Sequence, residues 1–317
     1  MDFAQRRSLL STVKGLYVLT RFLPTISWGI SASLMGLAFA LPDGRFAGAD
    51  WLNYVLVLIN VVLLHGVASH AINDLYDWQS GTDRLSPGNY SGGSKVIRKK
   101  LLSQEQLKII AIATIIMGTL ITFILLRRFG YSIFIFWGIA LWSSIAYTQP
   151  PFRLSYRPLL GEWLAGFPAV GAVTVLTYFI FTETVSGKVL LAAALQALFA
   201  VGLLMFHHIS DVSSDLAANP PKITTVAYAA GKWGQARCNL VAVLYFALII
   251  PLSLIGLFWH PVFILSAIFA LPCIFLSYRV KTCSVRDITA RESWIFALVI
   301  THAVAYFVAK NTLFTIF

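Results

Sequence analysis

The stretch VLLAAALQALFAVGLLMFHHIS, residues 189–210, contains no Asp, Glu, Lys or Arg and ends directly before Asp211. A helix needs about 20 apolar residues to cross the ~30 Å hydrocarbon core of a bilayer, so this stretch predicts a membrane-spanning helix. Segments of similar length and character recur along the chain at 22–41, 51–72, 109–126, 131–148, 163–182, 238–259, 261–278 and 293–309. Lipid offers no partner for backbone hydrogen-bonding groups, so each span must be helical. We therefore expect an all-α integral membrane protein, one domain over residues 1–317, built as a bundle of nine transmembrane helices.

The overall composition indicates the same class. Of the 317 residues, 58% are hydrophobic and 12% are charged, whereas soluble domains are about a quarter charged. The net charge of +11 is spread over short loops between apolar segments, which argues against nucleic acid as a partner. The three cysteines, Cys238, Cys273 and Cys283, form no C-x-x-C pair, so a thiolate metal site is not expected.

The distribution of positive charge predicts the orientation. With a cytoplasmic N-terminus, nineteen of the 24 Lys and Arg residues face the cytoplasm and five face the other side. Residues 1–21 are expected to form an interfacial N-terminal segment, and their Lys14 and Arg21 do not fit a cleaved signal. Residues 73–103 and 211–236 are the long polar loops on the cytoplasmic side, and we expect them to cap the active site. Other loop cations, such as Lys99 and Lys100, are expected to contact lipid headgroups.

Two aspartate clusters follow equivalent spans, the second and the sixth. Asn73, Asp74 and Asp77 share one helical face, and Asp211 and Asp215 repeat the four-residue spacing. Acids at a membrane boundary are costly unless they pair or bind a ligand, although a single one could be solvated or form a helix-end salt bridge. Hard oxygen ligands without cysteine favour Mg2+ or Ca2+ over zinc. Because Mg2+ commonly binds one or two carboxylates together with substrate phosphates, the clusters suggest a diphosphate substrate.

Cations in the flanking loops would complete such a site. We expect phosphate oxygens to be bound by Lys95, Arg98, Arg153 and Lys222, since Arg and Lys are the usual phosphate partners. His207 and His208 precede Asp211 directly; one could act as a base or contact an acceptor, or each could simply bond a neighbouring helix.

At these residues the chain resembles a known family. The run N-D-x-x-D-x-x-x-G-x-D over 73–83 is similar to the first aspartate motif of the UbiA superfamily of intramembrane aromatic prenyltransferases. Residues 147–157, YTQPPFRLSYR, with Gly161-Glu162, also resemble a segment of that family. The Gly81-x-Asp83 spacing is closest to the dihydroxynaphthoate, or menaquinone-type, branch. In the second motif, His207-His208-Ile209-Ser210 replaces the Asn and Arg usual in that branch, and Lys222 and Thr224 lie two residues late.

The resemblance implies transfer of a polyprenyl group from its diphosphate to an aromatic acceptor in quinone biosynthesis, in a multi-pass protein of a prokaryotic plasma membrane. It implies Mg2+ as cofactor, bound by Asn73, Asp74, Asp77, Asp211 and Asp215. The four aspartates are expected to be catalytic, with Tyr147 offering a π face to the allylic cation. Substrate contacts are expected from Asn73, Asp83, Lys95, Arg98, Arg153, Lys222 and His208.

Other functions remain possible at the level of sequence. Hydroxybenzoate prenyltransferases, archaeal ether-lipid geranylgeranyl transferases and terpene cyclases belong to the same superfamily. A secondary transporter also has many spans, but it would place polar residues near the bilayer midplane, whereas these acids lie at span ends. A non-catalytic lipid-binding protein would not need two intact aspartate clusters.

Overall fold

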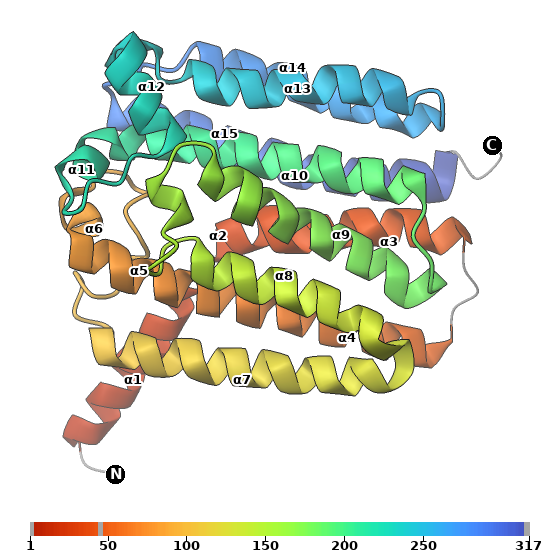
Figure 1. The fold of residues 1–317 in the computed structure, drawn as a ribbon, viewed down its shortest axis with the longest axis horizontal. Helices are drawn as coiled ribbons and strands as arrows, with labels where there is room; N and C mark the ends of the chain where they lie inside the picture. The colour runs from red at the N-terminus through yellow and green to blue at the C-terminus, as the bar shows by residue number, and fades with distance from the viewer. Residues whose placement is uncertain (1–2, 44–46, 314–317) are drawn as a thin grey trace.

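The protein is a bundle of roughly parallel helices (Figure 1). The computed structural model describes residues 3–43 and 47–313, and every regular element in those ranges is a helix. The α-helices are α1 (Phe3–Leu19), α2 (Phe22–Thr25), α3 (Ser31–Asp43), α4 (Gly48–Val61), α5 (Ser69–Ser80), α6 (Thr82–Leu85), α7 (Gln104–Phe129), α8 (Ile133–Ala146), α9 (Phe167–Thr182), α10 (Gly187–His207), α11 (Val212–Ala217), α12 (Thr225–Trp233), α13 (Leu240–Gly256), α14 (Ile264–Tyr278) and α15 (Val285–Val308). The expected all-α membrane class is confirmed.

Continuous helical stretches long and apolar enough to span a membrane number eight in the described ranges. They are Phe22–Leu41, Gly48–Ser80, Gln104–Ala146, Glu162–Thr182, Gly187–Ala217, Gln235–Gly256, Pro261–Tyr278 and Val285–Thr312. The count of nine spans is thus not confirmed. The stretch Gln104–Ala146 joins α7 and α8 through the 3-10 turn Gly130–Ser132, and Figure 1 shows α8 running back beside α7.

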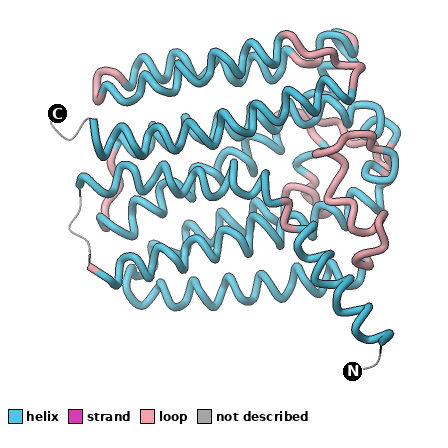
Figure 2. Tube along the Cα trace, turned by 180° about the vertical axis from the view of Figure 1, so that it is seen from behind, coloured by secondary structure: helices cyan, strands magenta, loops and turns pink. Residues whose placement is uncertain are grey.

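The helix that begins at Gly187 forms the centre of the bundle. Almost every side chain of α10 from Val189 to Phe206 is buried, and α10 packs against α3, α9, α13 and α15. The short helices α6, α11 and α12 gather at one end of the bundle, at the left of Figure 1. Seen from behind in Figure 2, most of the loops also lie at the first end. The fold therefore brings both aspartate motifs to the same end.

The described residues contain four wide π-helical turns. One, Ala309–Leu313, follows α15; the other three are Ile26–Ile30 before α3, Val62–Ala68 between α4 and α5, and Glu162–Gly166 before α9. A π-helical turn holds one more residue than an α-helical turn and recurs at functional sites. Each of the last three turns contributes residues to the lining of the cavity described below. The widened turns make room inside an otherwise close-packed bundle.

Candidate active site

Asn73, Asp74 and Asp77 of the first motif lie in the last two turns of α5, and Asp83 lies in α6, which follows Gly81, where φ is +96°. Asp77 is 2% exposed and accepts three hydrogen bonds: from Lys222 Nζ at 2.6 Å, from the Tyr156 hydroxyl at 2.9 Å and from Asn73 Nδ2 at 2.9 Å. The predicted shared face of Asn73 and Asp77 is present. Tyr156 was not anticipated from the sequence, where it stands 79 residues from Asp77.

Asp74 pairs with Arg21, which the sequence offered only as an argument against a cleaved signal. Arg21 Nη2 lies 2.9 Å from Asp74 Oδ1, and the two side chains are 12% and 3% exposed. The backbone N–H of Ser94 donates to Asp74 Oδ2 at 3.0 Å, and the Ser94 hydroxyl also donates to that oxygen. Arg21 has a left-handed backbone (φ 42°) at the start of the first span. In the sequence, the only feature that points to this ion pair is a lone arginine at that boundary.

The second motif is bound to the same loop that follows the first. Asp211 accepts hydrogen bonds from Ser86 Oγ at 2.5 Å, from Ser91 Oγ at 2.8 Å and from the Gly92 N–H at 3.3 Å. Residues 86–94 therefore bridge the two motifs. Asp215 differs sharply: it is 1% exposed, and neither carboxylate oxygen has a hydrogen-bond partner.

The pKa values of two groups at the motifs, Asp83 and Lys222, are shifted strongly from their ordinary values. Burial raises the pKa of Asp83 well above its ordinary value, and the Asp77 and Asp74 charges raise it further. Burial would lower the pKa of Lys222, but the Asp77 and Asp215 charges outweigh it and raise that pKa well above its ordinary value. The site thus holds more acids than bases, which favours binding of further cations.

Gly93 sits where a side chain would collide with the acids. A Cβ there would lie 2.0 Å from Asp83 Oδ2 and 2.9 Å from Asp74 Oδ1, and the φ of +68° also favours glycine. The loop can approach the carboxylates this closely only because residue 93 has no side chain.

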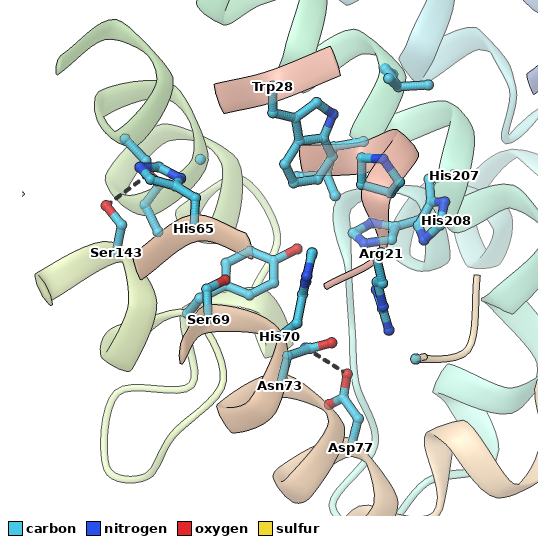
Figure 3. A pocket seen from close by; sticks show the side chains of 18 of the residues that line it. Arg21, Trp28, His65, Ser69, His70, Asn73, Asp77, Ser143, His207 and His208 are labelled. Carbon is cyan, nitrogen blue, oxygen red and sulfur yellow. Dashed lines mark hydrogen bonds between the residues drawn. The ribbon is translucent and has the colours of Figure 1, made fainter. Parts of the chain in front are cut away.

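A cavity of about 110 Å³ opens between these groups and the middle of the bundle. Its polar end is formed by Arg21, Asn73, Asp77, Asp83, Gly92, Gly93, Asp211 and Lys222. Its deeper wall includes Trp28, His65, Tyr147, Ala169, Val170, Leu203, Leu204 and Phe296. Figure 3 shows Asn73 and Asp77 at one end and Trp28 beyond Arg21, His207 and His208. The cavity is therefore amphipathic, polar at one end and largely apolar along its wall.

Three predicted phosphate ligands do not line the cavity. The Lys95 ammonium donates to the Gly88 carbonyl, Arg98 is exposed, and the Arg153 guanidinium lies 5.4 Å from the centre of the Tyr156 ring. Among the residues described at the cavity, Arg21 and Lys222 are its Lys and Arg cations.

The two histidines before Asp211 have different surroundings, although both line the cavity. His207 Nδ1 lies 2.6 Å from Oε1 of Glu292, an α15 residue that is 1% exposed. His208 is buried, and its Nδ1 has no hydrogen-bond partner. Glu292 was missed because it stands just before the apolar stretch of the last span.

The donor set fits Mg2+ shared with phosphate groups. Within 3–43 and 47–313, no three His, Cys, Asp or Glu side chains converge on one point, so a cage made of protein alone is not present there. Mg2+ does not need one, because one or two carboxylates and phosphate oxygens complete its shell. The two buried, unpartnered oxygens of Asp215 are the free ligands that such an ion would use.

The chain is similar to several known proteins. The model of the UbiA prenyltransferase family matches residues 23–301. A lycopene elongase/hydratase of Corynebacterium glutamicum is 28% identical over 242 residues, 71% of this chain and 73% of that protein. A solved UbiA homolog from Archaeoglobus fulgidus bound to GPP and Mg2+ has a TM-score of 0.63 at 18% identity, covering 92% of this chain and 99% of that one.

A structure described as digeranylgeranylglyceryl phosphate synthase has a TM-score of 0.56 at 16% identity, covering 94% of this chain and 99% of that one. These structures share the fold, and the family match extends over most of the sequence, from the first span to the last. The chain therefore belongs to the UbiA prenyltransferase family.

Proposed function

We propose that this multi-pass membrane protein transfers a prenyl group from a polyprenyl diphosphate to an acceptor in the bilayer, with Mg2+ as cofactor. The observation that carries the proposal is the amphipathic cavity: acids and two cations at one end, an apolar wall beyond them. An allylic diphosphate has the same division, with an anionic head and a hydrocarbon tail. The related A. fulgidus structures bound to GPP or DMAPP with Mg2+ support the choice of substrate.

Each motif has a proposed role. Mg2+ would be held by Asn73, Asp74, Asp77, Asp211 and Asp215, and when bound it would offset the diphosphate charge that develops as the allylic C–O bond breaks. Lys222 and Arg21 would bind phosphate oxygens, since both already point at acids of the site. Gly93 has no side chain and so lets the loop lie against Asp83 and Asp74. Tyr147, on the apolar wall, would face the allylic cation with its ring.

The cavity favours an uncharged acceptor. The proposal assigns both cations described at the cavity, Arg21 and Lys222, to the diphosphate, so a carboxylated acceptor would lack a cation of its own. A polyene hydrocarbon meets this condition, and the lycopene elongase/hydratase of C. glutamicum is named for such an acceptor. The second candidate is a dihydroxynaphthoate-like ring, favoured by the Gly81-x-Asp83 spacing.

For the orientation, the proposal is a cytoplasmic N-terminus and active site in a prokaryotic plasma membrane. The charge bias supports it, with nineteen of the 24 Lys and Arg residues on one side.

Incubation of the purified protein with labelled geranylgeranyl diphosphate, Mg2+ and a panel of acceptors tests the function. The panel contains lycopene, dihydroxynaphthoate, hydroxybenzoate and a glyceryl phosphate ether. We expect label in one lipid product, only with Mg2+ and not in Asp77→Ala. Label in the lycopene adduct supports the uncharged acceptor, and label in a naphthoate adduct supports the ring. If the folded protein neither binds nor cleaves the diphosphate, the proposed prenyltransferase activity is refuted.

A further inference from the structure

A buried histidine–glutamate pair lies next to the second aspartate motif, and its histidine, His207, lines the cavity. Glu292 Oε1 lies 2.6 Å from His207 Nδ1, and the two side chains are 2% and 13% exposed. The neighbouring Arg291 is bound to Asp287 at 2.9 Å, so it does not neutralise Glu292. A carboxylate buried at the end of a membrane span is costly, and such residues usually serve a function.

The pair has the arrangement of an oriented base. With Glu292 ionised, His207 carries its proton on Nδ1 and donates it to the carboxylate. Nε2 then keeps a lone pair, and His207 is among the residues that line the cavity (Figure 3). A purely structural bond between α10 and α15 would not require the histidine to border a cavity.

His207 also lies at a suitable depth. It precedes Asp211 by four residues, and the intervening turn is the 3-10 turn His208–Asp211. The rise between them is about 6–8 Å along the helix axis, away from the polar end. If the diphosphate binds at the aspartates, its allylic carbon projects to this level of the cavity, where Phe296 and Leu204 form the wall.

We propose that His207 Nε2 is the base that removes the proton from the alkylated acceptor, with Glu292 as its positioning residue. The inference rests on the proposed prenyl transfer. When the allylic C–O bond breaks, diphosphate leaves with the electron pair. A π bond of the acceptor then forms the new C–C bond, which leaves a cation on the acceptor. Loss of H+ from an adjacent carbon to Nε2 returns the C–H electrons as a C=C bond, and the Glu292 carboxylate stabilises the imidazolium. The step is the same for a polyene and for an aromatic ring.

The experiment separates ionisation from proton removal. His207→Ala is incubated with labelled geranylgeranyl diphosphate, Mg2+ and the acceptor that the parent protein uses. We expect diphosphate release within about threefold of the parent, a fall in alkylated product of roughly 100-fold or more, and prenyl alcohol in its place. Added imidazole should restore part of the alkylation. Glu292→Gln should lose product with diphosphate release intact, and Glu292→Asp should lose less.

The matched control is His302→Ala, ten residues beyond Glu292 on the same helix. His302 is buried and bonds to Ser266 at 2.9 Å and Gln196 at 3.1 Å, and it does not line this cavity. Its loss should lower thermal stability without altering the product or its response to imidazole.

Two results would overturn the inference. In the first, His207→Ala alkylates at the parent rate; in the second, diphosphate release and alkylation fall together and imidazole restores neither. If His207→Ala does not fold, the inference is overturned when the Glu292 variants form alkylated product at the parent rate. A parent protein that releases no diphosphate refutes the proposed function itself.

Discussion

Asp215 and Asp211 share one motif, yet substituting each by asparagine should change stability in opposite directions. Asp215 has two buried oxygens without hydrogen bonds, whereas Asp211 accepts from Ser86, Ser91 and the Gly92 N–H. An unsatisfied buried group costs about 1–3 kcal/mol, and more when charged. Asp215→Asn removes the unsatisfied charge and keeps the shape, and Lys222, which loses the attraction of Asp215, keeps its bond to Asp77. Without ligand the free energy of unfolding should therefore rise by about 1–2 kcal/mol. Asp211→Asn presents an amide N–H2 to serine donors and should lower it by about 1–3 kcal/mol.

Binding of Mg2+ and diphosphate should reverse the order of stability of the parent and Asp215→Asn. At 100 times Kd, a ligand that binds only the folded state stabilises it by about 2.7 kcal/mol. The parent should gain this amount from Mg2+ with geranylgeranyl diphosphate, and Asp215→Asn should gain almost none. The parent then becomes the more stable of the two by roughly 1 kcal/mol, although it was the less stable alone.

Chemical unfolding in detergent, with EDTA or with saturating Mg2+ and diphosphate, measures all three proteins. Both variants should lose prenyl transfer. The reasoning is refuted if Asp215→Asn is less stable than the parent in EDTA, or if it gains as much from Mg2+ and diphosphate as the parent does.

Three further predictions concern the surroundings of these acids. Tyr156→Phe removes a hydrogen bond to a buried carboxylate, Asp77, and should lower the unfolding free energy by about 1.5–3 kcal/mol; an unchanged denaturation midpoint would contradict the contact. Asp83 has a raised pKa in the folded protein, so it binds a proton there that the unfolded chain releases, and stability should fall as pH rises above the ordinary Asp value of about 3.9. Asp83→Asn should flatten that fall above about pH 4 in thermal melts, and a profile identical to the parent's would rule the explanation out. Chelation by EDTA should abolish prenyl transfer and added Mg2+ should restore it, whereas activity that persists in EDTA would exclude a metal role for the aspartates.

The membrane class and the placement of both aspartate motifs at one end could be predicted from the sequence. An apolar stretch of about 20 residues predicts a membrane-spanning helix in almost any context. Counting the spans from the N-terminus then predicts at which end of the bundle a motif lies. The predicted number of spans was not confirmed. The 3-10 turn Gly130–Ser132 joins α7 to α8 without a break in helical structure, so the two helices count as one of the eight stretches.

The ligands of the aspartates could not be predicted in the same way. Arg21 meets Asp74 across 53 residues, and Tyr156 meets Asp77 across 79. Such pairs depend on how helices pack, which local periodicity does not encode. Proximity in sequence was also misleading: Lys95 and Arg98 follow the first motif closely, but the loop turns them toward its own backbone and toward the exterior.

The π-helical turn at Val62–Ala68 has a consequence for the aspartates that follow it in the same span. Relative to an α-helix it contains one additional residue, and each residue of an α-helix advances the chain by about 100° around the axis. Deleting a single apolar residue from this turn would therefore rotate Asp74 and Asp77 by about that angle, away from Arg21 and Lys222. The motif would read unchanged, letter for letter, in a protein whose acids no longer faced the cavity. The direction in which these aspartates point is set by a residue count roughly two turns upstream of them.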